Sequence, residues 1–239
     1  MLLLFDIDGT LLIRAHVEHR HALAKAIREV WGAADPGYAA VPAAGRTDIE
    51  IAREICLLGG VGADRFDEAI DDFEIACARA YAGLAPPDLR DRLAPDVERV
   101  LTDLAERDGV RLSLVSGNLE PVARLKLDRA GLAPFFAAGQ GGFGSDAEDR
   151  TELPGIARRR AGSGRHPYPR EHTVVVGDTP NDIACAQADG VRCIAVTTGP
   201  YDAHELRRAD LVIAGLRELP PRIVRRTAAP AGVGLSLPD

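Results

Sequence analysis

The chain has 239 residues, of which 46% are hydrophobic and 27% charged, and its net charge is −7. This composition is ordinary for a globular protein with one large or two small domains. The acidic balance argues against nucleic acid as the main partner, and no apolar stretch reaches the roughly 18 residues that a membrane span needs.

Short apolar runs alternate with helical patterns along most of the chain. The runs expected to form strands are residues 1–5, 111–115, a shorter one near 135–138, 173–176, 193–196 and 211–213. The helical patterns after the first run are residues 97–105, 122–130, 151–161 and 180–188. Strands that alternate with helices predict a doubly wound, Rossmann-like α/β fold with a parallel sheet.

The segment after the first run breaks this rhythm and predicts three or four helices with no strand. The expected helices are residues 21–31, 47–58, where Thr47 would be the N-cap, and 64–81. Their expected core residues are Trp31, Ile51, Ile55 and Leu58. We therefore expect a core domain of residues 1–13 and 93–220, a helical insertion of residues 14–92, and a flexible tail of residues 221–239.

Acidic and hydroxyl side chains follow three of the predicted strands. Asp6 and Asp8 follow the first, Ser116–Asn118 the second, and Asp178 and Asp182 a later one. In open α/β sheets, ligands bind at the carboxyl ends of the strands, so these segments should meet. Asp6, Asp8 and Asp178 offer the hard oxygen ligands that suit Mg²⁺.

The same segments carry groups suited to phosphate chemistry. The Ser116 hydroxyl can bind a phosphate oxygen, and Gly117 permits close approach of its N–H. Two carboxylates spaced Asp-x-Asp, as in Asp6 and Asp8, can divide the roles of nucleophile and general acid/base.

Three motifs, in this order, resemble those of the haloacid dehalogenase superfamily in its branch of capped phosphatases, such as phosphoglycolate phosphatase and β-phosphoglucomutase. They are Asp6-Ile-Asp-Gly-Thr, Ser116-Gly-Asn and Gly177-Asp-Thr-Pro-Asn-Asp. The resemblance extends from residue 1 to about residue 220, and the helical insertion matches the cap of that family.

The resemblance implies a role for each acidic residue. Asp6 would attack phosphorus and form an aspartyl-phosphate, while Asp8 would protonate the leaving oxygen and then activate water. Asp6, the backbone carbonyl of Asp8, and Asp178 would hold Mg²⁺, with Asp182 supporting the site from behind or through water. Ser116, together with Gly117 and Asn118, would bind the phosphoryl group.

One position departs from the pattern of the family, which usually has a lysine before the last motif. Arg150 is the favoured replacement because it precedes the helical pattern of residues 151–161 and can hold phosphate in a bidentate way. Lys126, which lies five residues before Gly131 in a helical pattern, is the rival, and the choice between them stays open.

Two further groups of residues are considered for the insertion. Arg46, in a loop that resembles the substrate-facing loop of the family, is a candidate for binding a second anionic group or for exposure to solvent. His16, His19 and His21 cluster near the first linker, and we expect exposed helix positions for them.

The resulting expectation is a Mg²⁺-dependent hydrolase of small phosphate monoesters, such as phosphoglycolate or sugar phosphates. A phosphomutase and a non-catalytic protein that binds a phosphorylated metabolite remain as alternatives. The four cysteines are widely spaced, and a reduced cytoplasmic location fits them. Partners other than the metabolite would be a second copy of the chain or none.

Overall fold

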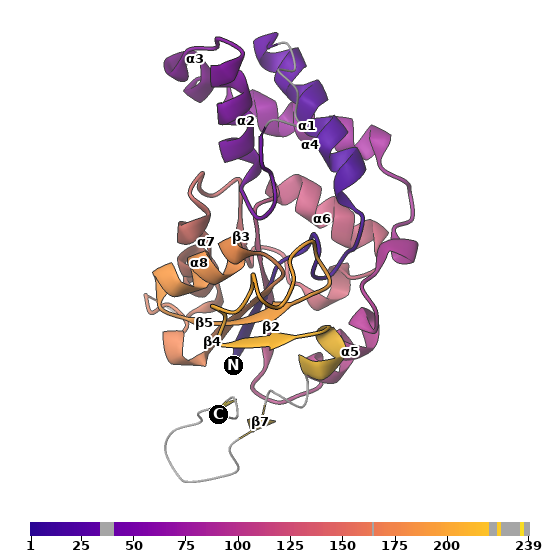
Figure 1. The fold of residues 1–239 in the computed structure, drawn as a ribbon, viewed down its shortest axis with the longest axis vertical. Coiled ribbons are helices and arrows are strands. Elements are labelled where there is room, and N and C mark those ends of the chain that lie inside the picture. Colours follow the sequence, from indigo (N-terminus) through magenta and orange to yellow (C-terminus); the bar gives the residue numbers. More distant parts are fainter. Residues whose placement is uncertain (34–40, 164, 220–223, 226–234, 237–239) are drawn as a thin grey trace.

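The computed structural model describes residues 1–33, 41–163, 165–219, 224–225 and 235–236. Figure 1 shows a sheet with helices around it and a separate group of helices above it. None of the helices within these ranges is long and apolar enough to cross a membrane.

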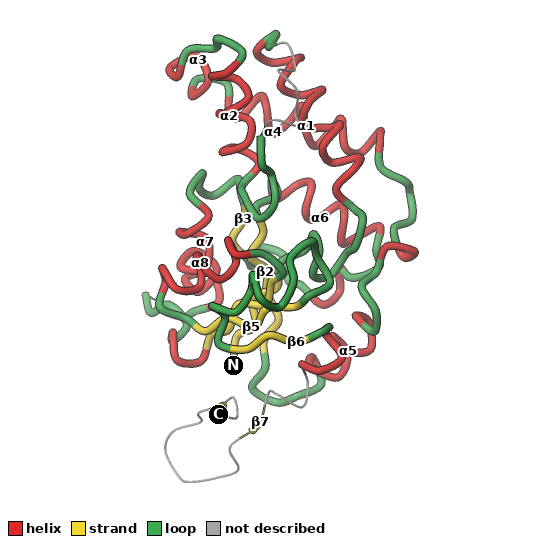
Figure 2. The backbone as a smooth tube through the Cα atoms, in the orientation of Figure 1, coloured by secondary structure: helices red, strands yellow, loops and turns green. Residues whose placement is uncertain are grey.

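Six parallel strands form the sheet, in the order β3-β2-β1-β4-β5-β6. Figure 2 shows strands gathered in the part of the molecule below the separate group of helices. The strands are β1 (Leu2–Phe5), β2 (Arg111–Ser116), β3 (Gly142–Phe143), β4 (Thr173–Gly177), β5 (Arg192–Val196) and β6 (Leu211–Ile213). β1 pairs with β2 on one side and β4 on the other, and all four of its residues are buried. This explains the continuous apolar run, because both faces of the strand lie under helices.

Alternate residues of β1 point to opposite faces of the sheet. Leu3 and Phe5 join one hydrophobic cluster with α5 (Val97–Ala105) and α6 (Glu120–Arg129). Leu2 and Leu4 join another with α7 (Leu153–Ala161) and α8 (Pro180–Asp189). Helices thus cover both faces, and the predicted doubly wound α/β fold is confirmed.

The strand predicted near residues 135–138 is wrong. A 3₁₀ helix, Ala133–Phe135, occupies the start of that segment, and Phe136 packs its ring edge-to-face against Phe5. The strand at this edge is β3, two residues long, which pairs with Val115 and Ser116 of β2. A strand so short leaves no periodic signal in the sequence. The described residues also contain the 3₁₀ helices Arg90–Arg92, Arg150–Glu152, Arg170–His172 and Leu216–Glu218.

The helices of residues 14–92, called the cap below, form a third hydrophobic cluster. They are α1 (His16–Trp31), α2 (Asp48–Leu58), α3 (Ala63–Asp67) and α4 (Ile70–Leu84). Trp31 stacks on Phe66, with ring centroids 4.6 Å apart, and contacts Phe73. Leu119 and Val122, at the start of α6, belong to the same cluster, so the cap packs onto the core there.

Two details of the cap differ from the sequence prediction. The single helix predicted over 64–81 is two helices, α3 and α4, and Phe66 of α3 stacks on Trp31. Leu58 is 62% exposed and is not a core residue, whereas Ile51 and Ile55 are buried as predicted. Thr47 is the N-cap of α2, and its hydroxyl accepts a hydrogen bond from the Glu50 amide, as predicted.

The two chain segments that join the cap to the core run side by side. The Ile13 amide donates to the carbonyl of Arg92 at 2.8 Å, and the Ala94 amide donates to that of Leu11 at 2.9 Å. These contacts lie at the predicted linkers. The division into domains at residues 13 and 92 stays a prediction, with which this arrangement agrees.

The predicted flexible tail, residues 221–239, lies mostly outside the described residues. Within it, β7 (Val224–Arg225) pairs antiparallel with β8 (Leu235–Ser236). The four cysteines are all buried and unpaired, which agrees with the reduced state expected of them.

The cap core provides a stability test with a control on the same helix. Phe73 is fully buried and Ile75 is 65% exposed, and both lie on α4. We expect Phe73→Ala to lower the free energy of unfolding by about 3–5 kcal/mol, because it removes buried surface and leaves a cavity. Ile75→Ala should change it by less than about 0.5 kcal/mol. Urea denaturation followed by circular dichroism measures both, and equal costs would contradict the assigned packing.

Candidate active site

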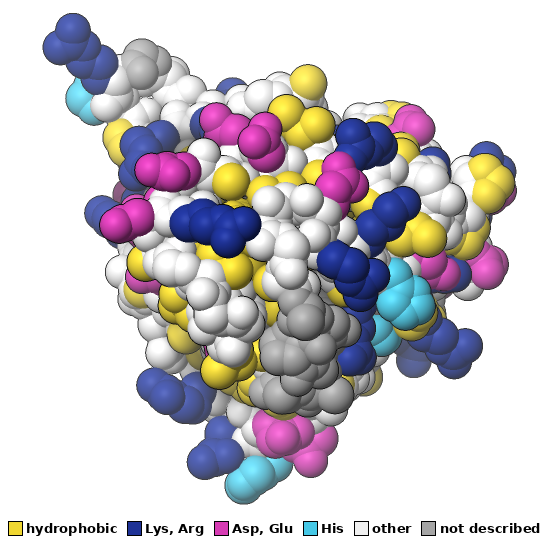
Figure 3. Space-filling view, turned by 90° about the horizontal axis from the view of Figure 1, so that it is seen from above, with side chains coloured by type: hydrophobic (Ala, Val, Ile, Leu, Met, Phe, Trp, Pro, Cys, Tyr) yellow, Lys and Arg dark blue, Asp and Glu magenta, His cyan; other side chains and the backbone are white. Residues whose placement is uncertain are grey.

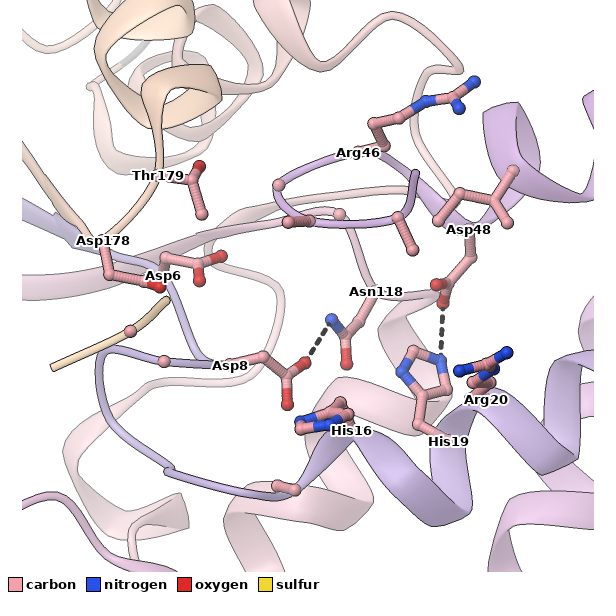
Figure 4. A pocket seen from close by; sticks show the side chains of 18 of the residues that line it. Asp6, Asp8, His16, His19, Arg20, Arg46, Asp48, Asn118, Asp178 and Thr179 are labelled. Carbon is pink, nitrogen blue, oxygen red and sulfur yellow. Dashed lines mark hydrogen bonds and ion pairs between the residues drawn. The ribbon is translucent and has the colours of Figure 1, made fainter. Parts of the chain in front are cut away.

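Three buried carboxylates meet at the carboxyl end of the sheet. Asp6 follows β1 and Asp178 follows β4, and the pairing of Phe5 with Val176 places the two loops next to each other. Asp182 lies in the first turn of α8. One oxygen from each carboxylate lies within 4.8 Å of the others, so the three could hold a metal ion. Figure 4 shows the side chains of Asp6 and Asp178 next to each other.

Backbone and side-chain contacts fix the Asp178 carboxylate. The Thr10 hydroxyl donates a 3.0 Å hydrogen bond to its Oδ1. The backbones of Gly9 and Gly199 approach so closely that a Cβ at either position would overlap this carboxylate. Gly9 also has φ +92°, a conformation that favours glycine. Glycine at positions 9 and 199 therefore leaves the space that the Asp178 carboxylate occupies.

The charge of this cluster is only partly balanced. Burial raises the pKa of Asp6 to about 7; Arg150 opposes this shift and Asp182 adds to it. Burial also raises the pKa of Asp178 to about 9, with Asp182 and Asp6 adding repulsion. Carboxylates resist ionisation when they lie close together with too little positive charge. The donor set and this excess of negative charge fit a divalent cation bound by carboxylate oxygens.

Asp182 caps the N-terminus of α8 with one of its carboxylate oxygens. Its Oδ2 accepts hydrogen bonds from the amide and hydroxyl of Thr179, and the Thr179 hydroxyl accepts from the Asp182 amide. This is a capping box that starts α8. The other oxygen, Oδ1, accepts from Arg150 at 2.5 Å. Both oxygens have protein partners, which suits the supporting role expected of Asp182.

Arg150 lies at the start of the 3₁₀ helix Arg150–Glu152 and reaches the carboxylate cluster. Its Nη2 donates to Asp6 Oδ1 at 2.9 Å and to Asp182 Oδ1 at 2.5 Å. The side chain is buried. Burial alone would lower the pKa of Arg150, but the charges of Asp182 and Asp6 outweigh it and raise the pKa above its usual value. Arg150, which the sequence favours as the replacement for the usual lysine, thus forms a hydrogen bond with Asp6.

Lys126 also reaches the site, although it lies in the middle of α6. It is completely buried, and its Nζ donates to Asp8 Oδ2 at 2.5 Å and to Asn118 Oδ1 at 2.6 Å. Asn118 in turn donates from Nδ2 to the same oxygen of Asp8 at 2.9 Å. Burial alone would raise the pKa of Asp8, but the charge of Lys126 and the hydrogen bonds from Lys126 and Asn118 outweigh it, so the pKa lies below its usual value.

The Ser116–Asn118 segment lies beside Asp8 through Asn118, and its binding of a phosphoryl group stays a prediction. Ser116 is fully buried, and its hydroxyl accepts only a long, 3.4 Å hydrogen bond from the Asn118 amide among the described contacts. The backbone of Arg46 comes so close to Gly117 that a Cβ there would overlap its carbonyl oxygen. The Gly117 carbonyl accepts a bond from the Asp48 amide at 2.8 Å. Gly117 therefore permits close approach of the cap loop.

Arg46 does not direct its guanidinium towards the carboxylates. Its Nε lies 2.8 Å from Glu50, and its Nη1 lies 2.6 Å from Glu54, both on α2. Figure 4 shows the side chain pointing away from Asp6 and Asp8. In this conformation Arg46 is an ion-pair partner within the cap, and binding of a second anionic group by Arg46 stays a prediction.

His19 and Asp48 belong to the site but were not recognised in the sequence. His16 and His21 are exposed as expected, whereas the exposure expected for His19 is wrong, because only 6% of it is accessible. Its Nε2 lies 2.9 Å from Asp48 Oδ2 and its Nδ1 lies 3.2 Å from Lys126 Nζ. Three histidines at neighbouring positions on one helix give no signal that a single one faces inward.

The composition of the chain distinguishes Lys126 as one of very few lysines. The chain has 29 lysines and arginines, and Lys25 and Lys126 are its two lysines. Lys25 is exposed on α1, whereas Lys126 has no accessible surface. In a chain that uses arginine at almost every basic position, a lysine in an apolar helix face indicates a site that needs a compact ammonium group.

A cavity of about 490 Å³ lies between the core and the cap. Its core wall includes Asp6, Asp8, Asn118, Arg150 and Asp178, and its cap wall includes Arg14, His16, Arg20, Leu23 and Ile51. Figure 3, seen from above onto the cap end, shows acidic and basic side chains intermixed on the outer surface. The site is thus enclosed by two parts of the chain and is suited to a small ligand.

Solved structures resemble this fold over almost the whole chain. They include a haloacid dehalogenase-like hydrolase from Streptococcus pneumoniae, with 20% identity, a TM-score of 0.60, and coverage of 92% of this chain and 96% of that one. A β-phosphoglucomutase from Clostridium difficile has 15% identity, a TM-score of 0.66 and coverage of 91% and 92%. A predicted phosphoglycolate phosphatase from Haemophilus somnus has 18% identity, a TM-score of 0.62 and coverage of 92% and 96%.

The sequence comparisons differ in outcome. No curated protein matches the chain significantly. The family model for haloacid dehalogenase-like hydrolases matches residues 3–187, a range that includes Asp6, Asp8, Asn118, Lys126, Arg150 and Asp178. Because this match covers well over half of its length, the chain belongs to the haloacid dehalogenase-like hydrolase family.

Proposed function

We propose that this protein is a Mg²⁺-dependent phosphatase that hydrolyses small phosphate monoesters through an aspartyl-phosphate on Asp6. The observation that carries the proposal is the juxtaposition of Asp6 with Arg150, Asp178 and Asp182, of which Asp6, Arg150 and Asp178 line the cavity between the core and the cap. Membership of a hydrolase family supports the reaction class.

In this mechanism Asp6 supplies the nucleophile. One of its oxygens, Oδ1, accepts from Arg150, and the guanidinium has further N–H groups with which to bind a phosphoryl oxygen. A fixed guanidinium at this point both orients the carboxylate and stabilises charge that develops on the transferring group. The covalent intermediate forms when an Asp6 oxygen bonds to phosphorus and the ester oxygen leaves.

Asp8 is the group proposed to transfer the proton. Lys126 and Asn118 both donate to Oδ2, while Oδ1 has no partner among the described residues. The carboxylate is thus held by one oxygen, and the other remains for protonating the leaving oxygen and for accepting a proton from the hydrolytic water. The two carboxylates of the Asp-x-Asp motif have different cationic partners, which suits different roles.

The metal proposed for the cluster is Mg²⁺, held by Asp6, the Asp8 backbone carbonyl and Asp178. When bound, it would neutralise the carboxylates and polarise the phosphoryl group. Thr10 and the backbones of Gly9 and Gly199 keep Asp178 in place for this task.

A phosphomutase is the alternative that the family similarity leaves open, since structures that resemble this fold include β-phosphoglucomutases. A mutase returns the phosphoryl group to a second hydroxyl, whereas a phosphatase passes it to water. Product analysis with a sugar phosphate distinguishes the two, because one releases inorganic phosphate and the other an isomer. A binding protein without turnover would produce neither.

Substitution of the nucleophile tests the proposed reaction. We expect Asp6→Asn to abolish Mg²⁺-dependent release of phosphate from p-nitrophenyl phosphate, because an amide cannot form the acyl phosphate. Asp128→Asn, at an exposed position of α6, should retain the wild-type rate. Turnover by Asp6→Asn close to that of the control would exclude Asp6 as the nucleophile.

Metal binding can be measured without turnover. We expect Mg²⁺ to raise the melting temperature of the wild-type protein in a concentration-dependent manner, because a ligand that binds the folded state stabilises it. Asp178→Asn should lose most of this shift, whereas Asp128→Asn should keep it. A shift that is equal in all three proteins would assign the effect to a different site.

The contact of Arg150 with Asp6 leads to a prediction about rate. Arg150→Met should lower kcat/KM about 10²–10³-fold, the usual effect of removing one preorganised group that stabilises transition-state charge. Arg150→Lys should fall between this variant and the wild type, because it keeps the charge but not the planar fork. Arg159→Met, at an exposed position of α7, is the control. If Arg150→Met and Arg159→Met show the same kcat/KM, the assigned role is wrong.

A further inference from the structure

Lys126 has three acceptors for its three N–H groups. They are Asp8 Oδ2 at 2.5 Å, Asn118 Oδ1 at 2.6 Å and His19 Nδ1 at 3.2 Å. An ammonium group is a donor only, so three acceptors satisfy it completely. Two of them come from the core and the third, His19, comes from the first helix of the cap.

This arrangement determines the tautomer of His19. Its Nδ1 faces an ammonium group and has to accept, so the ring proton is on Nε2. That nitrogen donates to Asp48 Oδ2 at 2.9 Å, and Figure 4 shows this bond. The imidazole also packs edge-to-face on Tyr81, with ring centroids 5.8 Å apart. A carboxylate that fixes the tautomer of a neighbouring histidine fixes the direction in which its lone pair points.

Asp48 also bonds to the core directly, in addition to the contact of His19 with Lys126. Its Oδ2 also accepts from the Leu119 amide at 2.8 Å, and its own amide donates to the Gly117 carbonyl at 2.8 Å. The adjacent Thr47 hydroxyl donates to the Glu148 carbonyl at 2.6 Å. The N-terminus of α2 is therefore bonded to two core loops, the one after β2 that carries Asn118 and the one after β3 that carries Glu148.

We propose that His19 and Asp48 are positioning residues that hold Lys126 on Asp8, so that the acid/base group is fully oriented only when the cap is docked on the core. The contacts run from Asp48 to His19, from His19 to Lys126, and from Lys126 to Asp8. Each contact joins a donor to an acceptor within 3.2 Å, and the first two involve cap residues. This inference rests on the proposed acid/base role of Asp8.

The arrangement has a chemical consequence for the leaving group. With Lys126 held, Asp8 is fixed through Oδ2, and its Oδ1 has no partner within the described part of the chain. When His19 can no longer accept, one buried N–H of Lys126 loses its partner, which is costly, and the ammonium group has to move. Misplacement of Asp8 slows proton transfer to a poor leaving group and has much less effect on one that departs without a proton.

The first experiment compares kcat/KM for phenyl phosphate and p-nitrophenyl phosphate, because this ratio of constants reports the step in which the leaving group departs. His19→Phe keeps an aromatic ring against Tyr81 but removes both ring nitrogens. We expect kcat/KM to fall about 10- to 100-fold for phenyl phosphate and by less than about fivefold for p-nitrophenyl phosphate. His19→Asn, whose Oδ1 can replace Nδ1 as an acceptor, should recover part of the loss, and Asp48→Ala should resemble His19→Phe.

The control is His21→Phe, at an exposed position on the same helix, which should keep both rates. An equal fall for the two substrates in His19→Phe, or no fall, would overturn the proposal. A merely structural role of His19 would lower both rates together.

A second experiment needs no turnover, because Lys25 and Lys126 are the two lysines of the chain. Reductive methylation followed by mass spectrometry should modify the exposed Lys25 in every variant and leave Lys126 protected in the wild type. In His19→Phe and Asp48→Ala, with circular dichroism confirming a folded chain, we expect Lys126 to react about tenfold faster, as the loss of a bond to a charged group implies. Continued protection of Lys126 in both variants would overturn the proposal. If Lys126 reacts faster in the variants but the wild-type protein hydrolyses no phosphate ester, only the proposed function is contradicted.

Discussion

The buried negative charge at the carboxyl end of the sheet is the constraint on which the rest of this structure depends. Asp6, Asp178 and Asp182 bring ligand oxygens within 4.8 Å of one another in a region shielded from water. Repulsion between such groups is costly unless cations lie close by. Arg150 supplies one cation, and the raised pKa values of Asp6 and Asp178 indicate that more positive charge is needed.

The chain uses two different cations at two ends of the site. The guanidinium of Arg150 bridges Asp6 and Asp182, a task that its planar group of donors can perform. The ammonium group of Lys126 donates from one nitrogen to three acceptors, which suits its compact shape. Arg150 and Lys126, the two candidates for the lysine of the family, thus contact different carboxylates, Asp6 and Asp8. Which of them replaces that lysine stays a prediction.

The cap contributes to the site through hydrogen bonds as well as through enclosure. Its α2 begins with Thr47 and Asp48, which bond to core loops, and its α1 brings His19 to Lys126. Apolar packing of α4 on α6 supports the same interface. Hydrophobic contact is non-directional and holds the two parts together, while the polar contacts fix their register. The geometry around Asp8 consequently depends on residues far from it in the sequence.

The sequence by itself determined the sheet, the helical insertion, and the meeting of residues 6, 116–118 and 178, because strand periodicity and the order of elements decide which loops share an edge. It could not place β3, whose two residues carry no periodic signal, or separate α3 from α4. Only the tertiary structure decided that His19 is buried, that Arg46 pairs with Glu50 and Glu54, and that Lys126 lies on Asp8. The physical reason is that these contacts join the cap to the core or depend on the direction of one side chain, and neither is encoded in local spacing.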